Sequence, residues 1–233
     1  MSVLLSTRGL SKHFDGLQAV SDVDFDLPQG QVRALIGPNG AGKTTLVGMI
    51  CGRIEPSEGK VQFLDRDITR MPAHRRITAG MAYTFQITSV FPGLPVRENV
   101  ALAARRRKRG DDSVEEVLDR VGLLDRIDQD AGDLSYGHQR LLEIAMGLVQ
   151  APKLLILDEP TQGLSEGEIA EFKTLVRAVT GETTVLLIEH NMSVVMELAD
   201  RVTVLNFGSV LAEGTPDDIH HNPDVQAAYL GTG

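Results

Sequence analysis

The sequence predicts an α/β fold in which a mostly parallel β-sheet forms the core. Short apolar runs alternate with longer helical patterns over most of the chain, whereas the first thirty residues show the alternation of a hairpin. Strand patterns are absent between Gln86 and about Gln150. We therefore expect one domain, residues 1–233, with a core of residues 1–86 and 151–233, an N-terminal antiparallel β flank and an inserted helical subdomain, residues 87–150.

The antiparallel flank comes first. The segments VLLSTRGLSKHF and AVSDVDFDL alternate apolar and polar residues on either side of the pair Asp15-Gly16. Such alternation predicts strands with one buried face, and an Asp-Gly pair favours a tight hairpin. We expect this hairpin to pack on the main sheet.

The strands of the main sheet are expected from apolar runs that helical patterns separate, the arrangement typical of parallel strands joined by helices. These runs are VRALIG, KVQFL, MAYTF, KLLILD, TTVLLIE and RVTVLN.

The inserted subdomain contains PVRENVALAARRRKRG, DSVEEVLDRVGLL and the helical pattern after LSYGH. At about 100° per residue, Arg105 to Arg109 would point all round a helix, which favours a solvated helix end over a basic face; a membrane-proximal contact is the alternative. The C-terminal segment TPDDIHHNPDVQAAYLG predicts two short helices separated by Pro223. Its adjacent His220 and His221 lack a third ligand and make a poor metal site.

The composition limits the classes of function. The chain has 23 basic and 32 acidic residues, and its net charge of −9 argues against nucleic-acid binding. The single Cys51 lies in the apolar run LVGMICG, so we expect a buried thiol and a reducing, cytoplasmic setting. The N-terminus does not resemble a secretion signal, and no apolar run nears the roughly 18 residues that span a bilayer. A partner would therefore have to cross any membrane.

The strongest chemical signal is GPNGAGKTT, which follows the run VRALI and opens a helical pattern. It fits the P-loop motif, in which glycines let backbone N–H groups surround a phosphate at a helix N-terminus. Lys43 would reach the β- and γ-phosphates, and the Thr44 hydroxyl would bind Mg²⁺. A plain glycine turn, the alternative, would not require Lys-Thr at this position. The expected nucleotide-binding residues are Asn39, Gly40, Ala41, Gly42, Lys43, Thr44 and Thr45.

Polar side chains end three further apolar runs. In KLLILDEP, Asp158 would accept from the Mg²⁺ shell and need a low pKa, while Glu159 would orient the attacking water and take its proton. A turn ended by Pro160 is the alternative. His190 ends TTVLLIEH and Gln86 ends MAYTF, positions suited to a γ-phosphate sensor and to a Mg²⁺ or water ligand. A structural histidine is the alternative at His190.

In order and spacing these motifs resemble those of ATP-binding cassette (ABC) ATPases, from about Leu4 to Leu230. The resemblance implies a RecA-like P-loop NTPase fold that binds and hydrolyses ATP with Mg²⁺. It also implies that Phe14 stacks on adenine; a plain core aromatic is the alternative.

LSYGH corresponds to the signature of the family. The resemblance implies that Ser135 and Gly137 contact the γ-phosphate held by a second ATPase subunit, in a nucleotide-induced homodimer or heterodimer. Ser135 would also N-cap its helix. Two departures stand out: Tyr136 and His138 occupy the third and fifth signature places, and the loop after the Asp-Glu strand reads TQGLS. Ser165 and Glu168 predict a capping box there.

The signature helix, the segment EHNMSVVMELADRVTVLNFGSVLAEGTPDDI and the ending NPDVQAAYLG most resemble ATPase subunits of branched-chain amino acid importers and their urea or amide relatives. Transmembrane permease subunits, a second ATPase, and indirectly an extracytoplasmic binding protein are the implied partners, with the chain peripheral on the cytoplasmic face. A lipopolysaccharide-type exporter ATPase is the near alternative. A soluble ABC factor would call for two cassettes or a long coiled coil, and a scaffold without turnover would not need Glu159 and His190.

The segment ITSVFPGLPVRENV, after Gln86, is expected to border the groove that receives a cytoplasmic helix of the permease. Its apolar residues Val90, Phe91 and Leu94 would be exposed for this contact. Core packing of Phe91 is the alternative.

Overall fold

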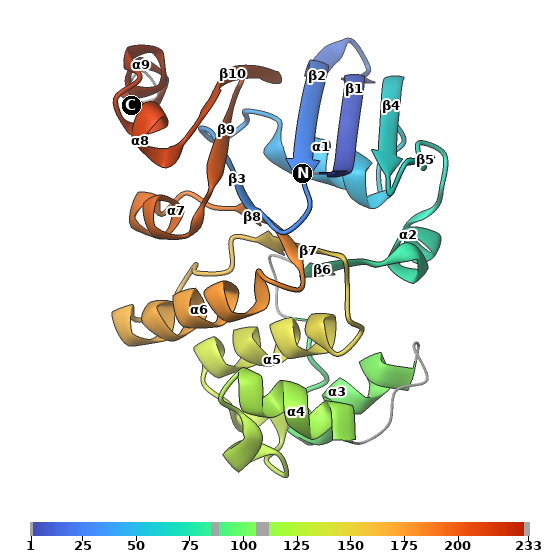
Figure 1. The fold of residues 1–233 in the computed structure, drawn as a ribbon, viewed down its shortest axis with the longest axis vertical. Coiled ribbons are helices and arrows are strands. Elements are labelled where there is room, and N and C mark those ends of the chain that lie inside the picture. Colours follow the sequence, from blue (N-terminus) through green and yellow to red (C-terminus); the bar gives the residue numbers. More distant parts are fainter. Residues whose placement is uncertain (1, 85–88, 106–111, 231–233) are drawn as a thin grey trace.

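The computed structural model describes residues 2–84, 89–105 and 112–230. A six-stranded sheet in the order β10-β9-β3-β8-β7-β6 forms the core (Figure 1). Its neighbours pair in parallel, except that β10 returns antiparallel beside β9. The strands are β3 (Val32–Ile36), β6 (Met81–Thr84), β7 (Leu154–Asp158), β8 (Thr184–Ile188), β9 (Arg201–Asn206) and β10 (Ser209–Gly214). The expected α/β fold with a mostly parallel sheet is confirmed.

The expected antiparallel flank is present as a second sheet, in the order β2-β1-β4-β5. Its strands are β1 (Val3–Phe14), β2 (Leu17–Pro28), β4 (Glu58–Phe63) and β5 (Arg66–Asp67). The run KVQFL forms β4, so its expected place in the parallel sheet is wrong. Val61 and Phe63 are buried while Lys60 and Gln62 are exposed, the alternation of a strand with one covered face. By contrast, every residue of β3, β7 and β8 is buried.

Helix α1 (Lys43–Cys51) fills the space between the two sheets. Its Leu46, Val47, Met49 and Ile50 belong to one apolar cluster with side chains from both sheets. Cys51, at its end, is a buried free thiol as expected, and burial raises its pKa to about 12. The other helices of the core are α2 (Ala73–Ala79), α6 (Glu166–Val179), α7 (Met192–Leu198), α8 (Pro216–His220) and α9 (Pro223–Leu230).

The helical lobe lies at one end of the molecule (Figure 1). It contains α3 (Val96–Ala104), α4 (Asp112–Arg120), the 3-10 turns η2 (Leu124–Arg126) and η3 (Ala131–Asp133), and α5 (Tyr136–Leu148). Within the described residues between β6 and β7, these are joined by loops and one isolated bridge, without a strand. Residues Arg106 to Arg109 lie outside the described part. The division at residues 87 and 150 stays a prediction.

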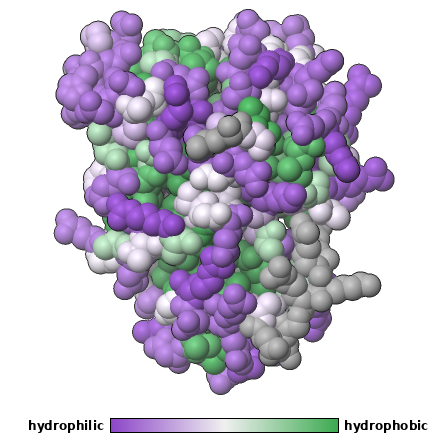
Figure 2. Space-filling model, viewed as in Figure 1, coloured by the Kyte–Doolittle hydropathy of each residue, from purple (hydrophilic) through white to green (hydrophobic). Residues whose placement is uncertain are grey.

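The surface is mainly hydrophilic on the face that Figure 2 shows, and hydrophobic residues reach it in separate patches. Among the helices of the described ranges, none is both long enough and apolar enough to span a bilayer. His220 and His221 are exposed, and the described residues contain no cluster of three metal-ligating side chains.

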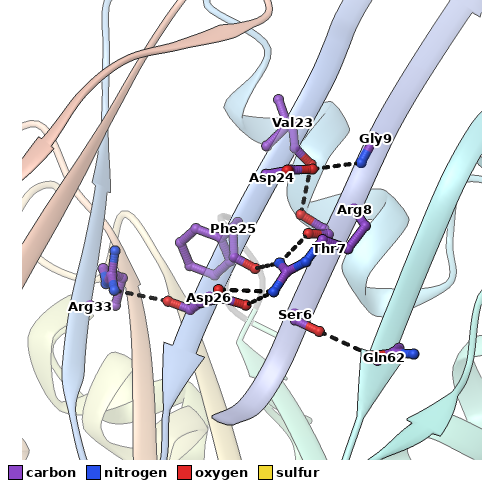
Figure 3. Close-up of polar contacts among 10 residues, drawn as sticks. All are labelled: Ser6, Thr7, Arg8, Gly9, Val23, Asp24, Phe25, Asp26, Arg33 and Gln62. Carbon is purple, nitrogen blue, oxygen red and sulfur yellow. Dashed lines mark hydrogen bonds and ion pairs between the residues drawn. The ribbon is translucent and has the colours of Figure 1, made fainter.

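A buried arginine fastens the two sheets together. The Arg33 guanidinium, on β3, donates to the backbone oxygen of Asp26 at 2.8 Å, on the antiparallel sheet (Figure 3). It also donates to the Thr203 hydroxyl on β9 at 3.0 Å and pairs with Glu213 on β10, both in the six-stranded sheet. Burial lowers its pKa to about 10. Arg33 therefore contacts both sheets while the residue is only 3% exposed.

We expect Arg33→Met to lower the free energy of unfolding by about 2–4 kcal/mol, because it removes the hydrogen-bond donor from three groups at once. Arg97→Met is the matched control, since Arg97 pairs with Asp128 in solvent and its loss should change stability by less than about 0.5 kcal/mol. Chemical denaturation measures both. Equal losses would show that Arg33 does not join the sheets.

Candidate active site

The GPNGAGKTT loop connects the carboxyl end of β3 to α1, which begins at Lys43. Its glycines are required by close packing of the backbone. A Cβ on Gly42, which has φ of 99°, would lie 2.5 Å from the Ala19 backbone oxygen. A Cβ on Gly37 would lie 2.2 Å from the Leu205 backbone oxygen. The loop is thus held against β2 and β9, and its shape cannot accommodate larger residues at these two positions.

Lys43 lies across this loop. Its Nζ donates to the backbone oxygens of Gly37, at 2.6 Å, and Pro38, at 3.1 Å. Burial lowers the pKa of Lys43, and the nearby carboxylates of Glu159 and Asp158 oppose that change. The structure therefore places one cation and two acids together at the predicted phosphate site.

A cleft of about 440 Å³ opens over the loop. A Cβ on Gly40 would project into open space, so the backbone here can approach a ligand closely. Together these features fit a nucleotide phosphate chain. All seven predicted loop residues line the cleft, joined by Glu159 and by residues that sequence reasoning missed: Leu17, Gln18, Ala19, Phe207 and Gly208.

Phe14 is not among the residues that line the cleft. It is 43% exposed and lies against Lys12, whose Nζ is 5.0 Å from the ring centroid, so its interpretation as a core aromatic is wrong. Its strand partner Leu17 reaches the cleft instead. Adenine stacking by Phe14 stays a prediction. Phe207, 86% exposed at the turn between β9 and β10, was missed because in the sequence it continues an apolar strand.

Asp158 ends β7 and Glu159 follows it with φ of 47°, an uncommon conformation outside glycine. The Glu159 backbone N–H donates to the Ile188 oxygen of β8 at 2.9 Å, and this bond holds the strained residue in place. Such backbone strain is found preferentially at functional sites. It supports the assignment of Glu159 as a reacting group.

The expected low pKa of Asp158 is wrong for the chain itself. Burial raises the pKa of this carboxyl, and the neighbouring Glu159 acts in the same direction. The Tyr83 hydroxyl opposes both by donating to Asp158 Oδ2 at 2.5 Å. Tyr83, on β6, was missed by sequence reasoning. The Arg53 guanidinium lies 4.2 Å from the centroid of the Tyr83 ring. The side chain that donates to Asp158 is therefore itself held by packing.

His190 is exposed two residues after the end of β8. Asn191 caps α7 by accepting from the backbone N–H groups of Ser193 and Val194. β3, β7 and β8 are parallel neighbours, so the P-loop, Asp158 and His190 meet at one edge of the sheet. Gln86 lies outside the described residues.

A buried carboxylate that sequence reasoning also missed links two of these loops. Glu189 is 1% exposed. One carboxylate oxygen accepts from the Thr161 backbone N–H at 3.0 Å and from the Thr161 hydroxyl at 2.5 Å. The other accepts from the backbone N–H groups of His190 and Asn191, each at 3.0 Å. Four hydrogen bonds thus fix the loop after Glu159 relative to the loop of His190.

The LSYGH residues lie apart from this cleft, at the start of α5. Ser135 is the N-cap residue, as expected, since its Oγ accepts from the His138 backbone N–H at 3.2 Å. The expected capping box of Ser165 and Glu168 is also present. Neither Ser135 nor Gly137 lines the cleft over the P-loop. Within one chain, the structure therefore does not bring the two glycine-bearing helix starts together.

A family model described as "ABC transporter" matches residues 20–162, and 98% of the chain aligns with an ATP-binding protein of such a transporter. The chain belongs to the ABC transporter family. It is an ATPase subunit of this family, with the P-loop and Asp-Glu strand in the positions described above.

Individual relatives support this assignment over nearly the full length. The chain is 39% identical to "High-affinity branched-chain amino acid transport ATP-binding protein LivG" of Escherichia coli, with 98% of each chain covered. It is 37% identical to the corresponding BraF of Pseudomonas aeruginosa, again over 98% of each. Among solved structures, an ATP-binding cassette of an ABC transporter in its ADP conformation aligns with a TM-score of 0.90 at 28% identity, covering 99% of this chain and 100% of that one.

We expect Glu189→Gln to lower the free energy of unfolding by about 2–4 kcal/mol, because its amide NH₂ would face hydrogen-bond donors in a buried site. ATP hydrolysis should fall about tenfold as the loops of Glu159 and His190 lose their common anchor. Glu182→Gln, at an exposed carboxylate paired with Arg120, is the control for both measurements. Wild-type stability and turnover in Glu189→Gln would contradict this role.

Proposed function

We propose that this chain is the ATPase subunit of an importer for branched-chain or related amino acids. A family model described as "Branched-chain amino acid ATP-binding cassette transporter" matches residues 209–233, from β10 into the C-terminal helices. This match is the observation that carries the proposal. The names of LivG and BraF support the same class of solute.

In the proposed reaction, the P-loop holds the phosphates of ATP while Lys43 moves its donors from loop carbonyls to the β- and γ-phosphates. Glu159 orients the attacking water and accepts its proton, and His190 contacts the γ-phosphate. Thr44, Asp158 and Gln86 would hold Mg²⁺, since hydroxyl, carboxylate and amide oxygens are the donors this cation prefers. The bound Mg²⁺ would neutralise charge on the phosphates.

We further propose that two such subunits, identical or paralogous, complete each other's sites. Ser135 and Gly137 lie at a helix N-terminus, where backbone N–H groups favour an anion, yet they are remote from their own P-loop cleft. A partner's γ-phosphate would satisfy them.

We place the chain at the cytoplasmic face of the membrane, bound to permease subunits. An extracytoplasmic binding protein would be an indirect partner, and we expect no binding to nucleic acid. The docking surface would include Phe91, which is 52% exposed, so its core alternative is wrong. Val90 and Leu94 are half-buried. The buried Asn99 fixes this segment, since its side chain accepts from the Phe91 backbone N–H at 2.7 Å and donates to the Phe91 and Leu94 oxygens.

Glu159→Gln keeps the shape of the proposed base and removes its basicity, so hydrolysis of MgATP should fall by roughly 10²- to 10⁴-fold while ATP still binds. Lys43→Ala should instead weaken ATP binding, because it removes a charge from the phosphate site. Steady-state hydrolysis and a fluorescent-nucleotide titration distinguish the two. Turnover within a few-fold of wild type in Glu159→Gln would exclude this role.

The same Glu159→Gln protein tests the composite site. It should be monomeric without nucleotide and dimeric with MgATP, because a trapped γ-phosphate stabilises only the closed state. ADP should not support the dimer. Ser135→Arg should abolish the dimer without changing the affinity of the monomer for ATP. Light scattering measures the mass in each case.

Phe91→Asp should reduce transport by at least about tenfold, because it places a charge in a proposed apolar contact. The basal ATPase activity of the isolated chain should stay within about twofold of wild type, since the site lies on other elements. Leu124→Asp, at another exposed apolar residue of the lobe, is the control in reconstituted vesicles. Transport unaffected by Phe91→Asp would remove this surface from the docking site.

A further inference from the structure

The hydroxyl group of Ser135 is engaged within its own chain. Ser135 Oγ lies 3.2 Å from Glu168 Oε1 and 3.0 Å from His138 Nδ1, and it accepts from the His138 backbone N–H. A serine hydroxyl has one hydrogen to donate. A phosphate oxygen that accepted a hydrogen bond from Ser135 Oγ would compete with Glu168 for that hydrogen.

Glu168 is held in place from α6. Its Oε2 accepts from the Ser165 backbone N–H at 2.9 Å and from the Ser165 hydroxyl at 2.8 Å. These bonds lower its pKa, the backbone contact foremost, and the carboxylate is therefore stabilised as an anion. One oxygen completes the capping box of α6, while the other accepts from Ser135, the N-cap residue of α5.

The same carboxylate fills the space beside Gly137. A Cβ on Gly137 would lie 2.0 Å from Glu168 Oε1, although the glycine belongs to α5 and the carboxylate to α6. The negative charge of Glu168 thus lies at the N-terminus of the helix that carries LSYGH. A dianionic phosphate entering there would be repelled by it.

Tyr136, the atypical third residue of the signature, contacts the same region. A Cβ on Gly163 would lie 3.2 Å from Tyr136 Cε1, so the ring packs against the loop that follows Glu159. Two contacts therefore join the start of α5 to α6 and to the loop before it: Ser135 to Glu168, and Tyr136 to Gly163.

We propose that Glu168 is a positioning residue that holds the Ser135 hydroxyl in its own chain until the γ-phosphate of a partner subunit displaces it. This inference rests on the proposed composite site. Glu168 would therefore disfavour ATP-dependent dimer formation, because the carboxylate has to release Ser135 and withdraw from Gly137 before the phosphate can bind. The expected result of removing its charge is a dimer that forms at a lower concentration of ATP.

Glu168→Gln in the Glu159→Gln background tests this inference. The half-maximal MgATP concentration for dimer formation should fall about three- to tenfold, because two exposed charge contacts of modest strength are removed per dimer. The affinity of each monomer for a fluorescent ATP analogue should not change, since Glu168 does not line the P-loop cleft. If Glu168 had only a structural role, Glu168→Gln would leave the half-maximal MgATP concentration for dimer formation unchanged.

Glu168→Asp separates the contact with Ser135 from helix capping. The chain itself uses aspartate at the equivalent place of a capping box, since Asp218 accepts from the Thr215 backbone N–H and hydroxyl at the start of α8. The shorter aspartate should therefore cap α6 but withdraw from Ser135, and the dimer midpoint should shift in the same direction. Asp218→Asn is the matched control, expected to leave the midpoint unchanged. Thermal unfolding of each variant monitors folding.

The outcomes distinguish the inference from the function on which it rests. A dimer of Glu159→Gln whose ATP midpoint is unchanged or raised by both Glu168 variants overturns the inference and leaves the composite site intact. Chains that stay monomeric at saturating MgATP with and without Glu168→Gln overturn both. A lowered midpoint in both Glu168 variants, absent from Asp218→Asn, supports the inference.

Discussion

The buried carboxylate of Glu189 is the constraint on which the geometry of the site depends. Parallel strands bring the ends of β7 and β8 to one edge of the sheet, but strand pairing stops before Thr161 and His190. The two carboxylate oxygens accept from the backbone N–H groups at these positions and complete the connection. Because a buried donor without an acceptor is unfavourable, the two loops are held in one relative arrangement.

The antiparallel sheet has a corresponding role for the phosphate loop. It covers α1 from the side opposite the parallel sheet, so the N-terminus of this helix is fixed between two layers. Arg33 adds a polar connection between the layers within an otherwise apolar interior. The antiparallel flank is therefore part of the support for the P-loop.

Much of the fold and the grouping of the candidate site at one sheet edge could be predicted from the sequence, because both depend on local patterns: GPNGAGKTT, KLLILDEP and TTVLLIEH each combine a buried strand with its terminal polar residues. KVQFL was misplaced because a short apolar run does not reveal its partners. The raised pKa of Asp158 depends on burial, which the hydrogen bond from Tyr83 only partly offsets, and tertiary packing determines both. The capping box of Ser165 and Glu168 was local and predictable, whereas the contact between Glu168 and Ser135 joins two distant helices.

The phosphate loop is packed against other main-chain segments. Gly37 and Gly42 approach backbone oxygens of Leu205 and Ala19, and the Gly208 N–H donates to the Ala41 oxygen at 3.0 Å. Contacts of this kind exclude a side chain at Gly37 and Gly42, and they depend on the length of the chain in each segment. An insertion at the β9–β10 turn would therefore displace the phosphate loop, so a tag or fluorophore placed there would disturb the nucleotide site.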